Sequence, residues 1–272
     1  MLMTMIEIIR DITMALIQGI TGLTMSSASG LMELASRSNG ERIWDFHLYM
    51  ELTVLGLLVA LVIRYRKRIV RIFNDAVKQK DYRELINIVL AALPMALVGF
   101  LLIGLIRTHY IFSYFYLIIA GFILTGLILY FANRLPRLSK VKNLKELSPK
   151  RALLVGAVQT LSYFPGLSRN ATSYVSSRCV GLNREDATDI TYMSLILILA
   201  GMLFRCLIAG HSRQFFAANW LSFTLMNLAI ALIAYFVLGF MQRYLKKHDS
   251  LKVFAWMNLV VVAVIAFFVL II

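Results

Sequence analysis

Six apolar segments, each about 20 residues long, dominate the sequence of this 272-residue chain. A helix of about 20 residues spans the hydrocarbon core of a bilayer, so each segment is long enough to cross a membrane once. Hydrophobic residues make up 60% of the sequence, too many for a protein whose whole surface faces water. The sequence therefore predicts an all-α polytopic membrane protein. The predicted spans are residues 46–65, 84–106, 112–133, 188–209, 218–240 and 251–272.

Two further apolar stretches, residues 5–37 and 152–177, are interrupted by small and polar residues. The first contains GLTMSSASG, and the second contains FPGLSRNATS, in which Pro165 and Gly166 break a helix. Non-helical backbone at membrane depth is tolerated only where protein or a water-filled cavity supplies its hydrogen bonds. We therefore interpret each stretch as a helical hairpin with an irregular tip.

The basic residues are clustered along the chain. A net charge of +14 would indicate a nucleic-acid partner in a soluble protein, but in a membrane protein the positions of Lys and Arg matter more. Nineteen of the 28 lie in residues 64–83, 134–151 and 243–252. Loops rich in Lys and Arg stay in the cytoplasm, so we expect these three segments to be cytoplasmic. No nucleic-acid partner is expected.

This charge distribution fixes the direction of the spans. With the basic loops inside, spans 46–65 and 218–240 run inward and span 188–209 runs outward. Stretch 152–177 then begins and ends inside, and stretch 5–37 begins and ends outside if the N-terminus is outside. Both are therefore predicted to be re-entrant hairpins that enter from opposite faces. Both chain termini are then expected to be extracytoplasmic.

An internal similarity agrees with this topology. QGITGL, from Gln18, aligns with QTLSYF, from Gln159, and the same offset of 141 places Ser27 on Ser168. The segment YMEL at 49–52 also resembles YMSL at 192–195. We predict one membrane domain with an inverted-topology repeat, as in many secondary transporters. Its parts are repeat one, about 5–133; a cytoplasmic linker, 134–151; and repeat two, about 152–272. Lys142 in the linker and Lys247 in the last basic segment are expected to be cytoplasmic.

Arg169 lies in the second interrupted stretch, where a charge is costly and usually functional. A guanidinium offers a fork of donors suited to phosphate, and helix N-termini after each break add partial positive charge. Hydroxyl and amide side chains near the two breaks would complete a phosphate cradle. The residues expected to bind phosphate or lipid are Arg169, Ser168, Asn170, Thr172, Ser26, Ser27, Ser29, Gln18 and Gln159.

A structural role for Arg169 is the alternative. In that case it pairs with the intramembrane carboxylate of Glu51 and locks the helices together. The two cysteines and four histidines offer too few ligands at a useful spacing, so no disulfide framework and no metal site are predicted.

The segment QTLSYFPGLSRNAT, preceded by RALLVGAV, resembles the second signature of the undecaprenyl-diphosphate phosphatase family of the bacitracin-resistance type. QGITGLTMSSASGL aligns with that family's first signature, and FHLYMELTVLGLLVAL resembles a third segment. The resemblance covers the whole chain and implies this fold, a location in the bacterial plasma (inner) membrane and a site for the diphosphate of a polyprenyl carrier lipid. In the second signature the matching residues are Gly156, Gln159, Pro165, Gly166, Ser168 and Arg169.

The departures from the family pattern fall on the chemistry. The resemblance implies two glutamates and a histidine as acid, base or nucleophile-assisting groups, but these positions hold Gln18, Gly22 and Leu31. The expected nucleophilic serine falls on Ala28, between two other serines. An amide and a glycine cannot exchange protons near neutral pH or hold a divalent metal as carboxylates would. We therefore expect hydrolysis to be lost or weak.

A relocated catalytic group is the alternative to loss. In the third segment, a glutamate and a glutamine of the family fall on His47 and Glu51, which are spaced one helical turn apart. Glu51, His47 and Ser27 are thus the candidate catalytic residues of an active enzyme. The other interpretation is that Glu51 balances Arg169 and His47 lies at the outer interface. The remaining histidines, His109, His211 and His248, fall in predicted loops and are expected to be solvated.

Three functions remain open at this point. The favoured one is binding of polyprenyl (undecaprenyl) phosphate, and its translocation by a flippase-like mechanism, for cell-envelope and peptidoglycan synthesis. The second is an active undecaprenyl-diphosphate phosphatase that recycles the lipid carrier and gives bacitracin resistance. The third is a structural or regulatory subunit, which the retained Pro165-Gly166 and Ser168-Arg169 pairs disfavour. The expected partners are the lipid and the bilayer, with a homodimer left open. No cofactor is expected, and a divalent metal only for the second function.

Overall fold

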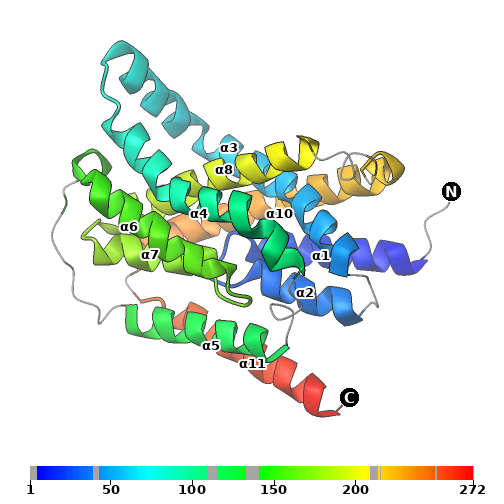
Figure 1. Ribbon diagram of the computed structural model, residues 1–272. Coiled ribbons are helices and arrows are strands. Elements are labelled where there is room, and N and C mark those ends of the chain that lie inside the picture. Colours follow the sequence, from blue (N-terminus) through cyan, green and yellow to red (C-terminus); the bar gives the residue numbers. More distant parts are fainter. Residues whose placement is uncertain are drawn as a thin grey trace.

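The computed structural model describes residues 5–38, 43–108, 115–132, 141, 143–208, 214, 216–248 and 250–271, and its regular elements are all helices (Figure 1). This is an all-α membrane protein. In chain order the principal elements are α1 (Met5–Thr21), α2 (Ala28–Ser38), α3 (Ile43–Lys78), α4 (Arg83–Thr108), α5 (Phe115–Phe131), η3 (Leu144–Glu146), α6 (Pro149–Gln159), η4 (Thr160–Tyr163), α7 (Arg169–Cys179), α8 (Arg184–Ile208), α10 (Trp220–Lys247) and α11 (Lys252–Ile271).

Three of the described helices are long and apolar enough to cross a membrane: α4 over Arg83–Leu101, α8 and α10. The described parts of α5 and α11 are apolar but shorter, covering Phe115–Phe131 and Lys252–Phe267. Helix α3 contains the predicted span 46–65 but continues to Lys78. The six-span topology therefore stays a prediction, whereas the apolar helical character of the chain is confirmed.

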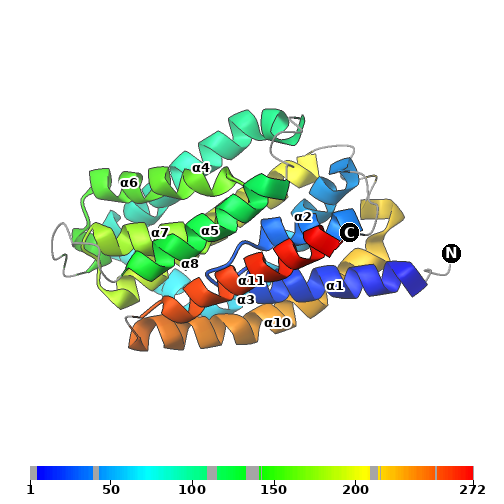
Figure 2. The same ribbon diagram turned by 90° about the horizontal axis from the view of Figure 1, so that it is seen from below.

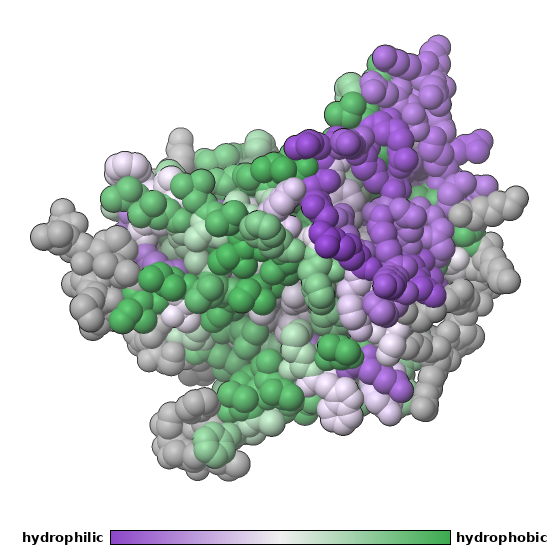
Figure 3. Space-filling view, turned by 180° about the vertical axis from the view of Figure 1, so that it is seen from behind, coloured by the Kyte–Doolittle hydropathy of each residue, from purple (hydrophilic) through white to green (hydrophobic). Residues whose placement is uncertain are grey.

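The extension of α3 and the start of α4 project from the bundle (Figure 1). This tip is strongly hydrophilic, whereas apolar side chains cover much of the neighbouring surface (Figure 3). It carries the basic segment 64–83. Lys145, in η3, ties the tip to the rest of the chain by donating hydrogen bonds to Asp75 at 2.8 Å and Asp81 at 3.0 Å. The charged segment is thus helical beyond the apolar part of α3, and its far end is tied to η3 through Asp75 and Asp81.

The two interrupted stretches form helical hairpins. Helices α1 and α2 pack together on either side of a break at 22–27, and α6 and α7 do so on either side of η4 and a break at 164–168. Ser27 accepts a hydrogen bond from the Gly30 amide at 3.3 Å, and Ser168 accepts one from the Ala171 amide at 3.3 Å. The two serines that align in sequence therefore have the same role, capping the helix that follows each break.

The second break packs tightly against α5. Gly166 has a φ of +82°, a conformation that favours glycine, and a Cβ there would lie 2.1 Å from the Ile118 carbonyl oxygen. The Thr125 hydroxyl donates to the Gly166 carbonyl at 3.3 Å and accepts from the Ser168 amide at 3.0 Å. These contacts hold the irregular backbone between Pro165 and Ser168 in one conformation.

The packing of the helices follows a regular pattern. Helix α3 contacts α10 and α8, α1 contacts α10, α6 contacts α4, and α8 contacts α4. Suppose that α1, α3 and α4 of the first half correspond to α6, α8 and α10 of the second half. The α1–α10 contact then corresponds to the α6–α4 contact, and the α3–α10 contact corresponds to the α8–α4 contact. Helices α5 and α11 pack side by side (Figures 1 and 2). This is the pairing expected of two similar halves.

Candidate functional site

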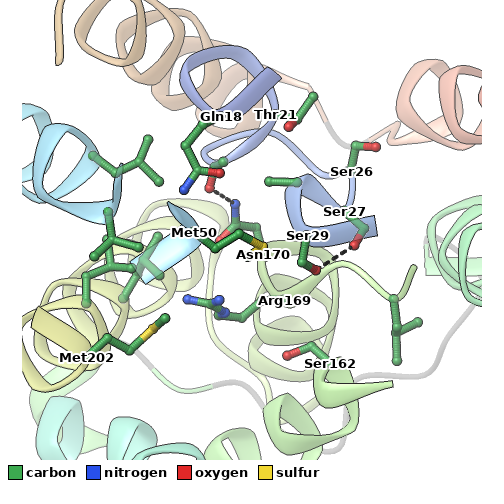
Figure 4. A pocket seen from close by; sticks show the side chains of 17 residues that line it. Gln18, Thr21, Ser26, Ser27, Ser29, Met50, Ser162, Arg169, Asn170 and Met202 are labelled. Carbon is green, nitrogen blue, oxygen red and sulfur yellow. Dashed lines mark hydrogen bonds between the residues drawn. The ribbon is translucent and has the colours of Figure 1, made fainter. Parts of the chain in front are cut away.

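A small cavity of about 60 Å³ lies between the two helix breaks and a wall formed by α3 and α8 (Figure 4). A cavity of this size can hold a few water molecules or one small polar group. The lining residues are Gln18, Thr21, Gly22, Ser26, Ser27, Ala28 and Ser29 from the first hairpin; Ser162, Leu167, Arg169 and Asn170 from the second; and Met50, Val54, Leu57, Leu195, Leu199 and Met202 from α3 and α8.

Arg169 is the single charged residue among the described residues that line this cavity. Its guanidinium points toward Met50 and Met202 (Figure 4), and its buried Nε atom has no hydrogen-bond partner. A charged arginine at the centre of a membrane helix costs about 2.5–3.5 kcal/mol on the insertion scale. Arg169 is also the first residue of α7, where helical amide groups add partial positive charge. The cavity is therefore electrostatically suited to an anion.

Asn170 joins the two hairpins. Its side-chain amide donates to the Gly22 carbonyl at 3.1 Å and to the Thr24 carbonyl at 2.9 Å, both in the first break. The Tyr192 hydroxyl of α8 donates to the neighbouring Leu23 carbonyl at 2.7 Å. Buried backbone carbonyls need such partners where no helix supplies them. Both side-chain amide hydrogen bonds of Asn170 therefore hold the first break in place.

The rest of the first break is held from α11. The Asn258 side-chain amide donates to the Met25 carbonyl at 3.1 Å, and its oxygen accepts from the Ser26 hydroxyl at 3.1 Å. The Ser27 and Ser29 hydroxyls lie 3.2 Å apart and both line the cavity. Gln18 lines it as well, and its buried Oε1 atom has no hydrogen-bond partner. Two hydroxyls and one amide are therefore arranged near Arg169.

Three of the predicted binding residues do not line the cavity. Ser168 is buried and caps α7, and the Thr172 hydroxyl donates to the Arg169 carbonyl at 2.9 Å. Gln159 is fully buried at the end of α6, and both polar atoms of its side chain lack a hydrogen-bond partner. The structure thus brings together Arg169 and the residues of the first break, with Asn170 beside them.

Glu51 forms an ion pair with Arg205 of α8, and not with Arg169. The interpretation in which Arg169 and Glu51 lock the helices together is therefore wrong. The carboxylate is 3% exposed. The side chain of His47 lies outside the part of the chain that the structure describes, as do His109 and His211, while His248 is exposed. No group of three or more His, Cys, Asp or Glu that could hold a metal ion occurs among the described residues.

The chain matches the family model of the bacitracin resistance protein BacA over residues 11–264. It belongs to the BacA family. Similar proteins include three named undecaprenyl-diphosphatase. The one from Aquifex aeolicus is 26% identical over 95% of this chain and 97% of its own length. Those from Methylobacillus flagellatus and Cellvibrio japonicus are 30% and 28% identical over 79% and 93% of this chain, and over 80% and 92% of their own lengths. With its apolar helices, the chain is a multi-pass bacterial membrane protein.

Gly22 and Leu31 occupy two positions where the BacA resemblance implies catalytic side chains, and both are closely packed. A Cβ at Gly22 would lie 2.6 Å from the Gln18 carbonyl oxygen and 2.7 Å from Leu57, so a larger side chain needs both the local backbone and Leu57 to move. Leu31 packs in an apolar cluster with Ile118 and Phe122 of α5. Neither position offers a group that can exchange protons.

Arg205 and two asparagines that support the site were not predicted from the sequence. Arg205 lies inside the predicted span 188–209, and the rule that intramembrane charges are functional would have identified it. Asn258 lies in another predicted span and holds the first break. Asn227 of α10 similarly accepts from the Gly56 amide at 2.7 Å and ties α10 to α3. The common signal is a polar side chain within an apolar segment.

Proposed function

We propose that this protein binds the phosphate end of a polyprenyl (undecaprenyl) phosphate carrier lipid in the Arg169 cavity and translocates it, with hydrolysis of the diphosphate lost or weak. One observation carries the proposal. The described residues lining the cavity include a half-buried arginine whose buried Nε atom has no hydrogen-bond partner, but no carboxylate and no imidazole. Such a lining can hold an anion, but it lacks a general acid or base.

The ligand class follows from the chemistry of the lining. A guanidinium fork, the N-terminus of α7 and the Ser27 and Ser29 hydroxyls are suited to phosphate oxygens. Opposite them, Met50, Leu199 and their neighbours on α3 and α8 give an apolar wall. The relatives named undecaprenyl-diphosphatase support a polyprenyl lipid as the molecule that carries this phosphate.

Translocation rests on the proposed inverted repeat. The equivalent caps at Ser27 and Ser168 and the matching helix contacts support two similar halves. The start of α1 and the end of α11 lie on the side of the molecule away from the basic tip of α3 and α4 (Figures 1 and 2). This arrangement supports a plasma-membrane orientation with that tip in the cytoplasm and both termini outside. A site between two discontinuous elements near the midplane is the usual location in transporters of this type.

Two measurements on purified protein test the proposal. Phosphate release from undecaprenyl diphosphate, with and without divalent metal, should be at least ~10²-fold slower than that of the Aquifex aeolicus relative. Undecaprenyl phosphate should nevertheless bind, and Arg169→Lys should weaken binding about tenfold at unchanged thermal stability. Arg64→Lys is the matched control, because Arg64 contacts Gln242 at 2.9 Å and does not line the cavity. Unchanged lipid binding in Arg169→Lys would refute the assignment.

An active diphosphatase is the second candidate. The names of the relatives and the Ser27 and Ser29 hydroxyls in the cavity favour it. Glu51, next to the lining residue Met50, and His47 would then supply acid or base, and a divalent metal would be needed only in this case. Rapid wild-type turnover that disappears in Glu51→Gln would establish this function and reject the first.

A further inference from the structure

We propose that Arg205 is a second phosphate-binding residue. When a diphosphate lipid binds, the partner of Arg205 changes from the Glu51 carboxylate to the terminal phosphate of the headgroup. This inference rests on the proposed function of the Arg169 cavity. It adds a reason for the cavity to prefer a diphosphate lipid over a monophosphate lipid. Four observations support it: the position of the ion pair, the direction of Arg169, the balance of charge and the exposure of the two side chains.

The Glu51–Arg205 pair lies at the seam between α3 and α8 that forms one wall of the cavity. Glu51 follows the lining residue Met50 on α3, and Arg205 lies one helical turn after the lining residue Met202 on α8. The Glu51–Arg205 pair therefore lies at the same height in the bundle as the end of the cavity that Met50 and Met202 line. Arg205 is thus close in the chain to the cavity without lining it in this structure.

The guanidinium of Arg169 points to this part of the wall. In Figure 4 it extends from α7 toward Met50 and Met202, away from the tip of its own hairpin. A phosphate bound to Arg169 on that side would lie between α7 and the seam. A second phosphoryl group joined to the first would extend the negative charge toward Arg205.

The charges favour such an exchange. Arg169 and Arg205 together carry two positive charges, and Glu51 carries one negative charge, so these three side chains have an excess of one cation. The Glu51 side chain is 5% exposed, whereas the Arg205 side chain is 26% exposed and more accessible to an incoming group. Carboxylate and phosphate present similar oxygen pairs to an arginine fork, so a phosphate can replace the carboxylate with the same geometry.

A purely structural role for the pair predicts different behaviour. At one end of the α3–α8 seam, Arg68 of α3 pairs with Asp189 of α8. If the Glu51–Arg205 pair only holds the other end, then neutralising Glu51 or Arg205 should lower stability and leave the ratio of the two lipid affinities unchanged. The ratio of affinities therefore separates ligand binding from structural support.

The test measures binding of undecaprenyl phosphate and undecaprenyl diphosphate to the full chain in lipid nanodiscs. Arg205→Gln should weaken diphosphate binding about tenfold and change monophosphate binding less than about twofold. Glu51→Gln, which leaves Arg205 without its carboxylate partner, should strengthen diphosphate binding by a similar factor. The double variant should behave like Arg205→Gln alone. Arg64→Gln, which removes an arginine of α3 that does not line the cavity, should change neither affinity.

The outcomes distinguish this inference from the function on which it rests. If Arg169→Lys weakens binding of both lipids but Arg205→Gln leaves their ratio unchanged, Arg205 is structural and only the present inference fails. If Arg169→Lys has no effect on either lipid, the proposed function fails with it. Should Arg205→Gln not fold, Glu51→Gln still decides, because an unchanged diphosphate preference in that variant would overturn the proposal.

Discussion

Removal of the Asn170 amide should loosen the junction between the two hairpins. This side chain is 4% exposed and donates to two carbonyls in the first break, those of Gly22 and Thr24. Both acceptors lie in non-helical backbone, where a lost donor is not replaced by a helical hydrogen bond. Asn170→Ala therefore leaves two buried carbonyls without this partner.

The magnitude follows from those two contacts. A buried polar group left without its partner costs about 1–3 kcal/mol, so the loss of both contacts should lower the free energy of unfolding by about 2–6 kcal/mol. At roughly 2–4 °C per kcal/mol, the melting temperature should fall by roughly 4–24 °C. Asn170→Asp should be at least as damaging at similar volume, because it replaces the donor with oxygens that face carbonyl oxygens. The comparison separates hydrogen bonding from packing.

Thermal unfolding of the purified variants, followed by fluorescence or by size-exclusion chromatography after heating, measures the effect. Thr172→Val is the matched control, because the Thr172 hydroxyl is also buried but bonds only within α7, to the Arg169 carbonyl. Its melting temperature should change by only a few degrees, reflecting about 1 kcal/mol. Equal melting temperatures for Asn170→Ala and Thr172→Val would refute the role assigned to Asn170.

Two further predictions concern backbone strain and orientation. Gly166→Ala should reduce the yield of folded protein, because its φ is +82° and a Cβ would strike the Ile118 carbonyl, whereas Gly201→Ala, with open space around it, should be neutral; size-exclusion profiles compare them. In intact cells, Lys247→Cys should resist an impermeant thiol reagent and Ala217→Cys should react, because the basic loops are predicted to be cytoplasmic. Labelling of Lys247→Cys from outside would reverse the proposed orientation.

The helix breaks could be predicted from the sequence because their signals are local. Pro165 and Gly166 stop one helix, and serines at 27 and 168 cap the next, so each break lies within the predicted stretch. The length of α3 could not be predicted from its apolar segment, because the charged residues after position 65 continue the helix beyond it. Hydropathy describes the part of a helix that suits a membrane and not the whole helix.

The composition of the site could be predicted only in part. Arg169, Gln18 and the serines of the first break do line the cavity, whereas Ser168, Thr172 and Gln159 do not. A hydroxyl near a helix start can face the cavity or bond to its own helix, and the sequence does not distinguish the two arrangements. The partner of Glu51 was also out of reach, because it depends on which helices are neighbours and on how each is rotated.

Under the proposed function, the junction between the hairpins limits where a lipid headgroup could pass. Asn170 of α7 binds the backbone of the first break, and a Cβ at Gly30 of α2 would lie only 3.1 Å from the Cα atom of Gly166 in the second break, so the two hairpins touch directly. Separating them would expose several carbonyls to hydrocarbon at once. The rates at which a ligand arrives and departs should therefore depend on motions of α3 against α8, and inhibitors that wedge between these two helices should act by slowing exchange.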